Sequence, residues 1–183
     1  MGQSFQQILE AINAAQAPQG MTTKIIALDG AGGAGKTTLA SKLSAALGDA
    51  PIIHQDDFAS WDNPLNWWPR LIKQVLKPLS KNQTARYARY DWGGARQLAE
   101  WREVQPCEYL ILEGVSASRE VFRPYLTFSV WVETPRAERL RRGLVRDGED
   151  ARELWKEWMA EEDKYISREQ PQNHVDVIVS GSK

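Results

Sequence analysis

The sequence has little cysteine, since Cys107 is the only one among its 183 residues. A single cysteine cannot form an internal disulfide, and the chain does not open with the charged and then apolar segments of a secretion signal. No apolar run approaches the roughly 20 residues that a membrane-spanning helix needs. We therefore expect a protein of the reducing cytoplasm, with no membrane partner.

An excess of charge of either sign is also absent. The formal net charge is -1 and the isoelectric point is about 6.2, so the chain lacks the basic field that attracts nucleic-acid polymers. An apolar fraction of 42% is typical of a globular protein. The length predicts one domain over residues 1–183, which includes an N-terminal helix and its connection at 1–20. Small molecules are the expected partners, and the composition leaves the oligomeric state open.

The most informative segment is KIIALDGAGGAGKTT at residues 24–38. It satisfies the pattern G-x-x-x-x-G-K-[ST], and it lies between a predicted strand at 25–28 and a predicted helix at 38–47. Backbone N–H groups of such a loop bind phosphates, Lys36 reaches the β and γ phosphates, and the hydroxyl of Thr37 suits Mg²⁺. The alternative is a glycine-rich turn that binds nothing. The predicted nucleotide-binding residues are Gly30, Ala31, Gly32, Gly33, Ala34, Gly35, Lys36, Thr37 and Thr38.

Further short apolar segments predict an α/β fold. Together with residues 25–28 they predict a doubly wound, five-stranded parallel sheet with helices on both faces, and the glycine-rich motif makes this a P-loop NTPase fold. A capping box of Ser4 and Gln7 predicts the N-terminal helix. We also predict a helix that starts near Trp67 and ends before Pro78, and another helix at 97–104. The additional predicted strands are residues 52–54, 109–112, 128–132 and 175–179.

Carboxylates follow two of these strands. Because ligands of open α/β sheets bind beyond the carboxyl ends of the strands, Asp56 is placed to accept a proton from an acceptor hydroxyl and to help hold Mg²⁺. Asp57 is expected to point elsewhere, toward the substrate side. Glu113 resembles the acidic group of a Walker B segment and is predicted to orient magnesium together with Thr37. The alternatives are a turn or cap residue for Asp56 and a solvated strand end for Glu113.

Arginines share one face of a predicted helix. Arg139, Arg142 and Arg146 are spaced i, i+3 and i+7, which suits a short lid at residues 136–148 that closes cations over the transferred phosphate. Lys36, Arg142 and Arg146 are therefore catalytic candidates beside Asp56. The alternative is a solvated face, because Glu138 can pair with Arg142.

Tryptophan is abundant, with eight residues in the chain. Several lie between the second and third strands of the predicted sheet, where rings can stack on a flat substrate and polar neighbours can bind hydroxyls. Core packing is the alternative for each ring. The predicted substrate-binding residues are Asp57, Trp61, Asp62, Arg86, Tyr90, Asp91 and Trp92.

These motifs resemble the uridine kinase-like branch of P-loop kinases, which includes nicotinamide riboside kinase, bacterial pantothenate kinase and phosphoribulokinase. The resemblance covers residues from about 24 to the last strand. It implies ATP and Mg²⁺ as cofactors, with Asp56 as base, Thr37 and Glu113 on the metal side, and Arg142 and Arg146 in the lid. The matching segments are GAGGAGKTTLA at 30–40, QDDF at 55–58, LEGV at 112–115, RLRRGLVRD at 139–147 and VDVIV at 175–179.

The substrate segment departs from this family. RYDW at 89–92 resembles uridine-cytidine kinases, but Ala95 stands where those enzymes place a base-reading histidine. We therefore expect a kinase that phosphorylates a hydroxyl of a small, nucleoside-like acceptor, and a vitamin-like alcohol stays open. Other interpretations are a nucleoside-monophosphate or small-metabolite kinase, favoured by Arg86, Arg89 and Arg96, and a non-kinase ATPase or switch.

Overall fold

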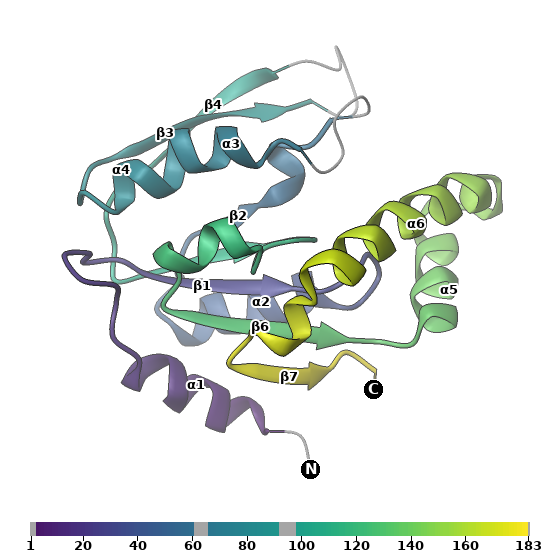
Figure 1. Ribbon diagram of the computed structural model, residues 1–183, viewed down its shortest axis with the longest axis horizontal. Coiled ribbons are helices and arrows are strands. Elements are labelled where there is room, and N and C mark those ends of the chain that lie inside the picture. Colours follow the sequence, from purple (N-terminus) through teal and green to yellow (C-terminus); the bar gives the residue numbers. More distant parts are fainter. Residues whose placement is uncertain (1–2, 61–65, 92–97, 183) are drawn as a thin grey trace.

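A computed structural model describes residues 3–60, 66–91 and 98–182. In this part of the chain five strands form one parallel sheet in the order β2-β5-β1-β6-β7 (Figure 1). The predicted five-stranded P-loop fold is thereby confirmed. The strands are β1 (Lys24–Asp29), β2 (Ile52–His54), β5 (Tyr109–Glu113), β6 (Phe128–Glu133) and β7 (Val177–Ser180).

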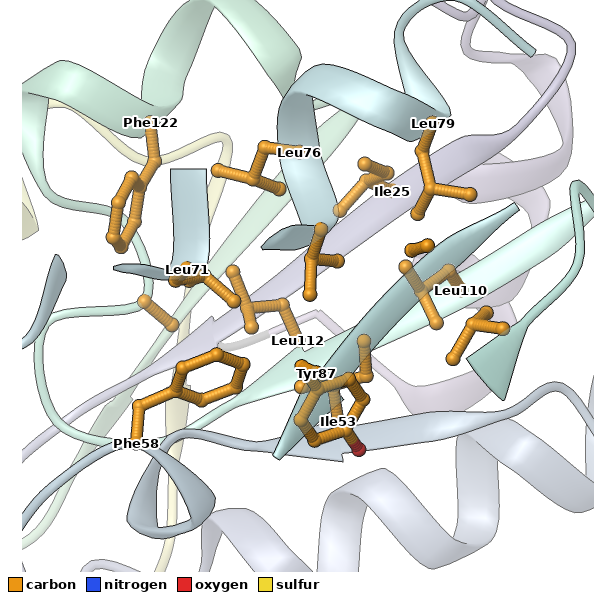
Figure 2. Packing of buried hydrophobic residues seen from close by; sticks show 14 of the residues in the cluster. Ile25, Ile53, Phe58, Leu71, Leu76, Leu79, Tyr87, Leu110, Leu112 and Phe122 are labelled. Atoms are coloured by element: carbon orange, nitrogen blue, oxygen red, sulfur yellow. The ribbon is translucent and has the colours of Figure 1, made fainter. Parts of the chain in front are cut away.

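Helices cover both faces of the sheet, because alternate residues of each buried strand point to opposite sides. Ile26 and Leu28 of β1 pack with α1 and α2, whereas Ile25 packs in the other core cluster, with Leu71. Figure 2 shows that second cluster, in which Phe58, Tyr87 and Phe122 join the aliphatic side chains. The helices are α1 (Phe5–Ala14), α2 (Lys36–Ala46), α3 (Trp68–Leu71), α4 (Lys77–Leu79), α5 (Arg136–Asp147) and α6 (Arg152–Glu169).

The N-terminal helix begins as the sequence predicts. Ser4 Oγ accepts a hydrogen bond from the backbone N–H of Gln7, and the Gln7 side chain accepts one from the backbone N–H of Ser4. This reciprocal capping satisfies N–H groups that have no partner inside the helix. Ile8 and Ile12 are the buried residues of α1.

The helical segment after Trp67 does not end before Pro78, so that prediction is wrong. A π-helical turn, η2 (Ile72–Leu76), joins α3 to α4, and α4 contains Pro78. The N–H of Lys77 bonds to the carbonyl of Ile72, five residues back. The wider turn changes the position of the carbonyls with which a proline ring collides in a regular helix, so the chain stays helical through Pro78.

Residues 97–104 were predicted to be helical, and the structure corrects this. Leu98–Val104 is strand β4, which pairs antiparallel with β3 (Ala85–Tyr90) in a separate two-stranded sheet. A register shift between Arg89 and Tyr90 interrupts the pairing. This irregularity breaks the alternation of apolar and polar residues that marks a strand, so the local sequence favours a helix. The strand forms because of its pairing with β3.

The carboxyl ends of three strands meet at one edge of the main sheet. Glu113 at the end of β5 is in register with Leu28 of β1 on one side and with His54 of β2 on the other. The loop after β1 and the 3₁₀ turn η1 (Gln55–Asp57) after β2 therefore begin at the same edge. α5 and α6 lie beside each other at one end of the molecule (Figure 1). Among the described residues, no helix has the length and apolar character required to cross a bilayer.

Candidate active site

The glycine-rich loop between β1 and α2 adopts a conformation that other residues rarely reach. Gly30 has φ 146° and Gly33 has φ 76°. A Cβ on Gly30 would lie 2.6 Å from the carbonyl oxygen of Val132, and one on Gly33 would lie 2.7 Å from the carbonyl oxygen of Arg139. The backbone of this loop therefore packs closely against β6 and α5, which requires glycine at both positions.

The start of α2 supplies the other groups expected of a phosphate site. The helix is preceded by Gly35, which has no side chain to cap the N–H groups of the first turn. Lys36 is buried, and its Nζ donates a hydrogen bond to the carbonyl of Ala31, 3.1 Å away. Thr37 Oγ1 donates to Oε1 of Glu113 at 3.4 Å. A helix N-terminus, an ammonium group and a hydroxyl are thus gathered beside the loop.

A cavity of about 1420 Å³ opens over this loop. It is lined by the loop and the start of α2, by the ends of β2 and β5, and by residues of α5 and α6. Sequence-predicted residues from distant parts of the chain thus share one cavity. They are Gly32, Gly33, Ala34, Gly35, Lys36, Thr37, Thr38, Asp56, Asp57, Glu113, Arg142 and Arg146.

Glu113 also has a partner that the sequence did not predict. Its Oε2 lies 2.7 Å from Nδ1 of His54 on the neighbouring strand. The hydrogen bond with Glu113 raises the pKa of His54 above its ordinary value, against the opposing effect of burial. Burial opposes ionisation of Glu113, but the His54 hydrogen bond and the charge of Lys36 together hold the Glu113 pKa below its ordinary value. Glu113 is therefore an oriented, ionised carboxylate.

Asp56 faces the cavity from η1. Its side chain is open to the cavity, although protein atoms of the cavity wall crowd it. This desolvation, together with the nearby charge of Glu113, raises the pKa of Asp56 above its ordinary value, while Lys36 and His54 act in the opposite direction. A carboxylate with a raised pKa is a stronger base than an ordinary aspartate, which suits a proton acceptor.

Asp57, the next residue, has different partners from Asp56, but these are protein groups, and its role in substrate binding stays a prediction. It is 5% exposed, and its Oδ1 lies 2.9 Å from Nε of Arg89. Tyr87 Oη donates to Oδ2 of Asp57 at 3.2 Å, and Arg70 Nη2 donates to the Asp57 carbonyl at 3.1 Å. Asp57 thus holds β3 against η1, and with it the antiparallel pair of β3 and β4, which we call the hairpin.

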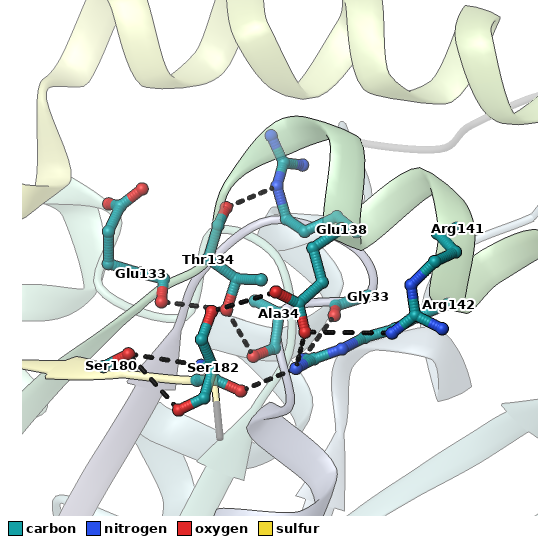
Figure 3. A network of polar contacts seen from close by, with 11 residues as sticks. Gly33, Ala34, Glu133, Thr134, Glu138, Arg141, Arg142, Ser180 and Ser182 are labelled. Atoms are coloured by element: carbon teal, nitrogen blue, oxygen red, sulfur yellow. Dashed lines mark hydrogen bonds and ion pairs between the residues drawn. The ribbon is translucent and has the colours of Figure 1, made fainter.

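The arginines of α5 have different surroundings. Arg142 donates to the carbonyls of Gly33 at 3.3 Å and Gly181 at 3.0 Å, and it pairs with Glu138 (Figure 3). Arg146 pairs with Asp147 at 2.8 Å. Arg142 therefore contacts the phosphate loop directly.

Arg146 lies beside the cavity instead of on the loop backbone. The hydrogen bond with Asp147 is the main cause that raises the pKa of Arg146, and the charge of Asp56 adds to it. Arg146 and the predicted base Asp56 thus line the same cavity. Lid closure by α5 stays a prediction.

The predicted substrate-binding residues are only partly brought together. Arg86, Tyr90 and Asp91 do not line the cavity among the described residues, and Arg86 instead lies 4.9 Å from the ring centre of Trp101. Trp61, Asp62 and Trp92 lie outside the described residues. Trp67 and Arg89 do line the cavity.

Comparisons with known proteins agree with this geometry. No family model matches the chain. The chain is similar to the uridine kinase of Borrelia duttonii (strain Ly), with 28% identity over 138 residues that cover 68% of this chain and 67% of that protein. It is also similar to the uridine kinase of Chlamydia pneumoniae, with 27% identity over 144 residues, 69% of this chain and 65% of that protein. The expected resemblance to the uridine kinase-like kinases is confirmed.

Solved structures show the same fold. A possible uridine kinase from Bacillus stearothermophilus has a TM-score of 0.68 and 21% identity, with 94% of this chain and 95% of that chain covered. A putative fructose transport system kinase from Silicibacter sp. TM1040 has a TM-score of 0.66 and 19% identity, with coverages of 96% and 97%. These uridine kinase-like and other kinase structures share the P-loop arrangement described above.

Some residues of the site carry little signal in the sequence. His54 shares a strand face with Asp56 by its spacing, but the sequence alone gave it no role. Glu162 of α6 also lines the cavity, and it contacts a loop residue 130 positions earlier in the chain. No local motif marks a contact of that sequence separation.

Proposed function

We propose that the protein is an ATP- and Mg²⁺-dependent phosphotransferase that phosphorylates a hydroxyl of a small, nucleoside-like acceptor. One observation carries this proposal: a single cavity is lined both by the phosphate loop, which follows β1, and by Asp56, which follows β2 on the other side of β5. A kinase needs these two parts within reach of one substrate pair, because phosphoryl transfer depends on positioning and on charge neutralisation.

The residues present fit a nucleoside triphosphate. The loop backbone approaches its neighbours so closely that a Cβ at Gly30 or Gly33 would collide with a carbonyl, and the uncapped first turn of α2 faces the same cavity. Backbone N–H groups at such a turn bind phosphate oxygens. The ammonium of Lys36 would bind the same polyanion and reduce its charge.

The residues also fit magnesium. Thr37 Oγ1 and Glu113 Oε1, which lie 3.4 Å apart, are the hard oxygen donors that this ion prefers. No group of three or more histidine, cysteine, aspartate or glutamate side chains forms a metal site among the described residues. The two oxygen donors of Thr37 and Glu113 therefore suit an ion that keeps several waters and also binds phosphate oxygens. When bound, Mg²⁺ would neutralise phosphate charge, and Asp56 would help to hold it.

Asp56 acts as the base in the proposed reaction. It takes the proton of the acceptor hydroxyl as that oxygen bonds to the terminal phosphorus, and the bond from this phosphorus to the bridging oxygen breaks to leave the nucleoside diphosphate. Arg146 supplies positive charge beside the transferred group, and Arg142 holds the Gly33 carbonyl of the loop. Because both arginines belong to α5, one helix both supplies positive charge at the transferred group and contacts the phosphate loop.

The acceptor side favours an uncharged molecule. Arg89 is a cation of the cavity lining near the hairpin, and it is paired with buried Asp57 at 2.9 Å and lies 3.9 Å from Glu100. Because these carboxylates balance its charge, Arg89 would attract a phosphate group on the acceptor only weakly. Among the described residues, this observation favours a nucleoside-like alcohol over a nucleoside monophosphate.

The test is nucleotide turnover by the purified protein with ATP or GTP and Mg²⁺. ADP or GDP release would be measured with no acceptor, and then with nucleosides, nucleoside monophosphates and vitamin-like alcohols in turn. We expect turnover that depends on an uncharged acceptor and yields its phosphorylated product. Equal turnover with and without every acceptor would contradict the kinase and support an ATPase or switch. Turnover only with monophosphates would support the alternative kinase.

A further inference from the structure

Helix α6 contacts the phosphate loop through one buried carboxylate. Oε1 of Glu162 accepts a hydrogen bond from the backbone N–H of Gly32 at 3.0 Å. The approach is close, because a Cβ on Gly32 would lie 2.8 Å from this oxygen and 3.2 Å from the ring of Trp155. The absence of a side chain at Gly32 thus allows α6 to reach the loop backbone.

The same carboxylate faces the first turns of α5. Its Oε2 lies 3.5 Å from Nη1 of Arg139, and the two residues are 7% and 8% exposed. Within the described part of the chain, these two atoms have no hydrogen-bond partner, although Arg139 Nε donates to the carbonyl of Thr134. Glu162 therefore makes one well-formed hydrogen bond, to the loop, and one long ionic contact, to α5.

Ionisation of Glu162 is costly where it lies. Burial raises its pKa above the ordinary value, while the charge of Lys36, the Gly32 N–H and Arg139 act in the opposite direction. Glu162 also lines the cavity that would receive anionic phosphates, where a negative charge repels them. At a phosphate site the useful property of Glu162 is therefore the oxygen that accepts the Gly32 N–H, and its negative charge is a disadvantage.

Two further contacts fix the position of α6. Tyr165, one turn after Glu162, donates from Oη to Oδ2 of Asp29 at 2.7 Å, at the residue directly before the loop. Trp155 donates from Nε1 to Oδ2 of Asp147 at 2.9 Å, and its ring lies against Gly143 of α5. The Glu162 side chain is thus presented to the loop by a helix that is fixed at the loop start and at the end of α5.

We infer that Glu162 is a positioning residue, whose oxygen acceptor holds Gly32 and with it the phosphate loop in its nucleotide-binding conformation. A glycine-rich loop loses much conformational entropy when it is ordered, so an external acceptor that orders it beforehand strengthens nucleotide binding. This inference rests on the proposed function, because it assumes a nucleotide in the loop. It predicts an effect on nucleotide affinity, with a much smaller effect on kcat.

The experiment compares two double variants that both remove the Arg139 and Glu162 charges. Arg139→Met with Glu162→Gln keeps an acceptor for the Gly32 N–H, whereas Arg139→Met with Glu162→Met does not. Replacement of both charges avoids an unpaired buried ion, which would itself destabilise the protein. Binding of ATP would be measured by calorimetry, kcat by turnover, and folding by thermal unfolding. Glu157→Met, an exposed position of α6, is the control for helix substitution.

We expect the variant without an acceptor, Arg139→Met with Glu162→Met, to bind ATP about tenfold more weakly than the variant that keeps one, as loss of a hydrogen bond predicts. The acceptor-keeping variant and Glu157→Met should bind within about threefold of the wild type, and kcat should differ by less than about threefold between the two double variants. Equal affinities of the two double variants would overturn the inference. If either double variant does not fold, Glu162→Gln and Glu162→Met in the otherwise unchanged chain are compared with each other, because both leave Arg139 unpaired to the same extent and differ only in the acceptor.

Failure of the proposed function gives a different result. If the wild-type protein binds no ATP, the assignment of the loop to a nucleotide is wrong and the inference falls with it. If the wild type binds ATP and the two double variants do not differ, only the role of Glu162 is wrong.

Discussion

His54 and Glu113 form a hydrogen-bonded pair across neighbouring strands, with 2.7 Å between Nδ1 and Oε2. The other oxygen of the same carboxylate, Oε1, lies 3.4 Å from the hydroxyl of Thr37. One oxygen of Glu113 is thus held by the sheet while the other faces the proposed magnesium site. In metal centres, a residue that hydrogen-bonds to a metal ligand fixes the orientation of that ligand. His54 is placed to do the same for Glu113.

Replacement of His54 tests that support. We expect His54→Ala to raise the Mg²⁺ concentration for half-maximal turnover by about tenfold, because Glu113 loses the partner that orients it. Turnover at varied Mg²⁺ and saturating ATP is the measurement. His174→Ala is the matched control, since His174 is exposed at the surface, and its Mg²⁺ dependence should equal that of the wild type. An unchanged Mg²⁺ dependence in His54→Ala would remove the metal role assigned to this pair.

Loss of the proposed base, Asp56, should lower the rate of the chemical step. We expect Asp56→Asn to lower kcat by about 10²- to 10⁴-fold, the range for removal of a general base, with a much smaller change in the affinity for ATP. Phosphorylated acceptor would be quantified directly. Asp150→Asn, the same change at an exposed position, should retain wild-type turnover. A wild-type rate in Asp56→Asn would show that another group accepts the proton.

The raised pKa of Asp56 predicts the acid side of the pH profile. A base must be ionised to act, so a raised pKa means that activity is lost at a higher pH than for an ordinary aspartate, whose pKa is about 3.9. We expect kcat/KM to fall, as the pH is lowered, at a pH above that value. Since His54 lowers the pKa of Asp56, His54→Ala should move this acid limb further upward. A limb at or below the ordinary value would contradict the described surroundings of Asp56.

Asp57 should contribute to stability more than to chemistry. Asp57→Ala leaves Tyr87 and Arg89 without their common acceptor, so we expect a loss of about 2 kcal/mol in the free energy of unfolding. Urea denaturation would measure it, and an unchanged slope would show that the folded state is otherwise intact. Asp150→Ala should lie within about 0.5 kcal/mol of the wild type. An equally small effect for Asp57→Ala would mean that the hairpin does not depend on this contact.

Asp29 presents a second stability test, at the start of the phosphate loop. Its fully buried carboxylate accepts hydrogen bonds from the N–H groups of Gly30, Ser116 and Ser118 and from the hydroxyls of Ser118 and Tyr165. Asp29→Asn turns an amide NH₂ toward some of these donors, so we expect a loss of about 3 kcal/mol in unfolding free energy, whereas Tyr165→Phe removes one hydrogen bond and costs about 1 kcal/mol. Equal losses would contradict this account of the network.

The sequence predicted the parts of the fold that depend on local pattern. The five parallel strands follow from short apolar runs, and the phosphate loop follows from its glycine spacing, because both patterns are set by residues close together in the chain. Asp56 and Glu113 could be placed at the same edge because parallel strands share their carboxyl ends. The N-terminal helix was marked by its own capping residues.

The remaining features depend on contacts between distant residues. β4 is a strand because Ala88 pairs with Trp101 and Ala85 with Val104, whereas its charged, irregular sequence alone favoured a helix. The helix through Pro78 depends on a π turn that no sequence pattern marked. The hydrogen bond from Gly32 to Glu162 joins residues 130 positions apart, and the only sequence feature at Gly32 was its membership of the loop.

The adjacency of Asp56 and Asp57 has a consequence for substrate selection. Asp56, the proposed proton acceptor, is directly followed by Asp57, which contacts Arg89 and Tyr87 of β3, so a displacement of β3 would be expected to move the proposed reacting centre through η1. A molecule of the wrong shape that pushes the hairpin outward would misalign the proton acceptor even while it stays bound. Discrimination among alcohols would then be expressed as slow turnover of poor substrates, with little difference in their occupancy.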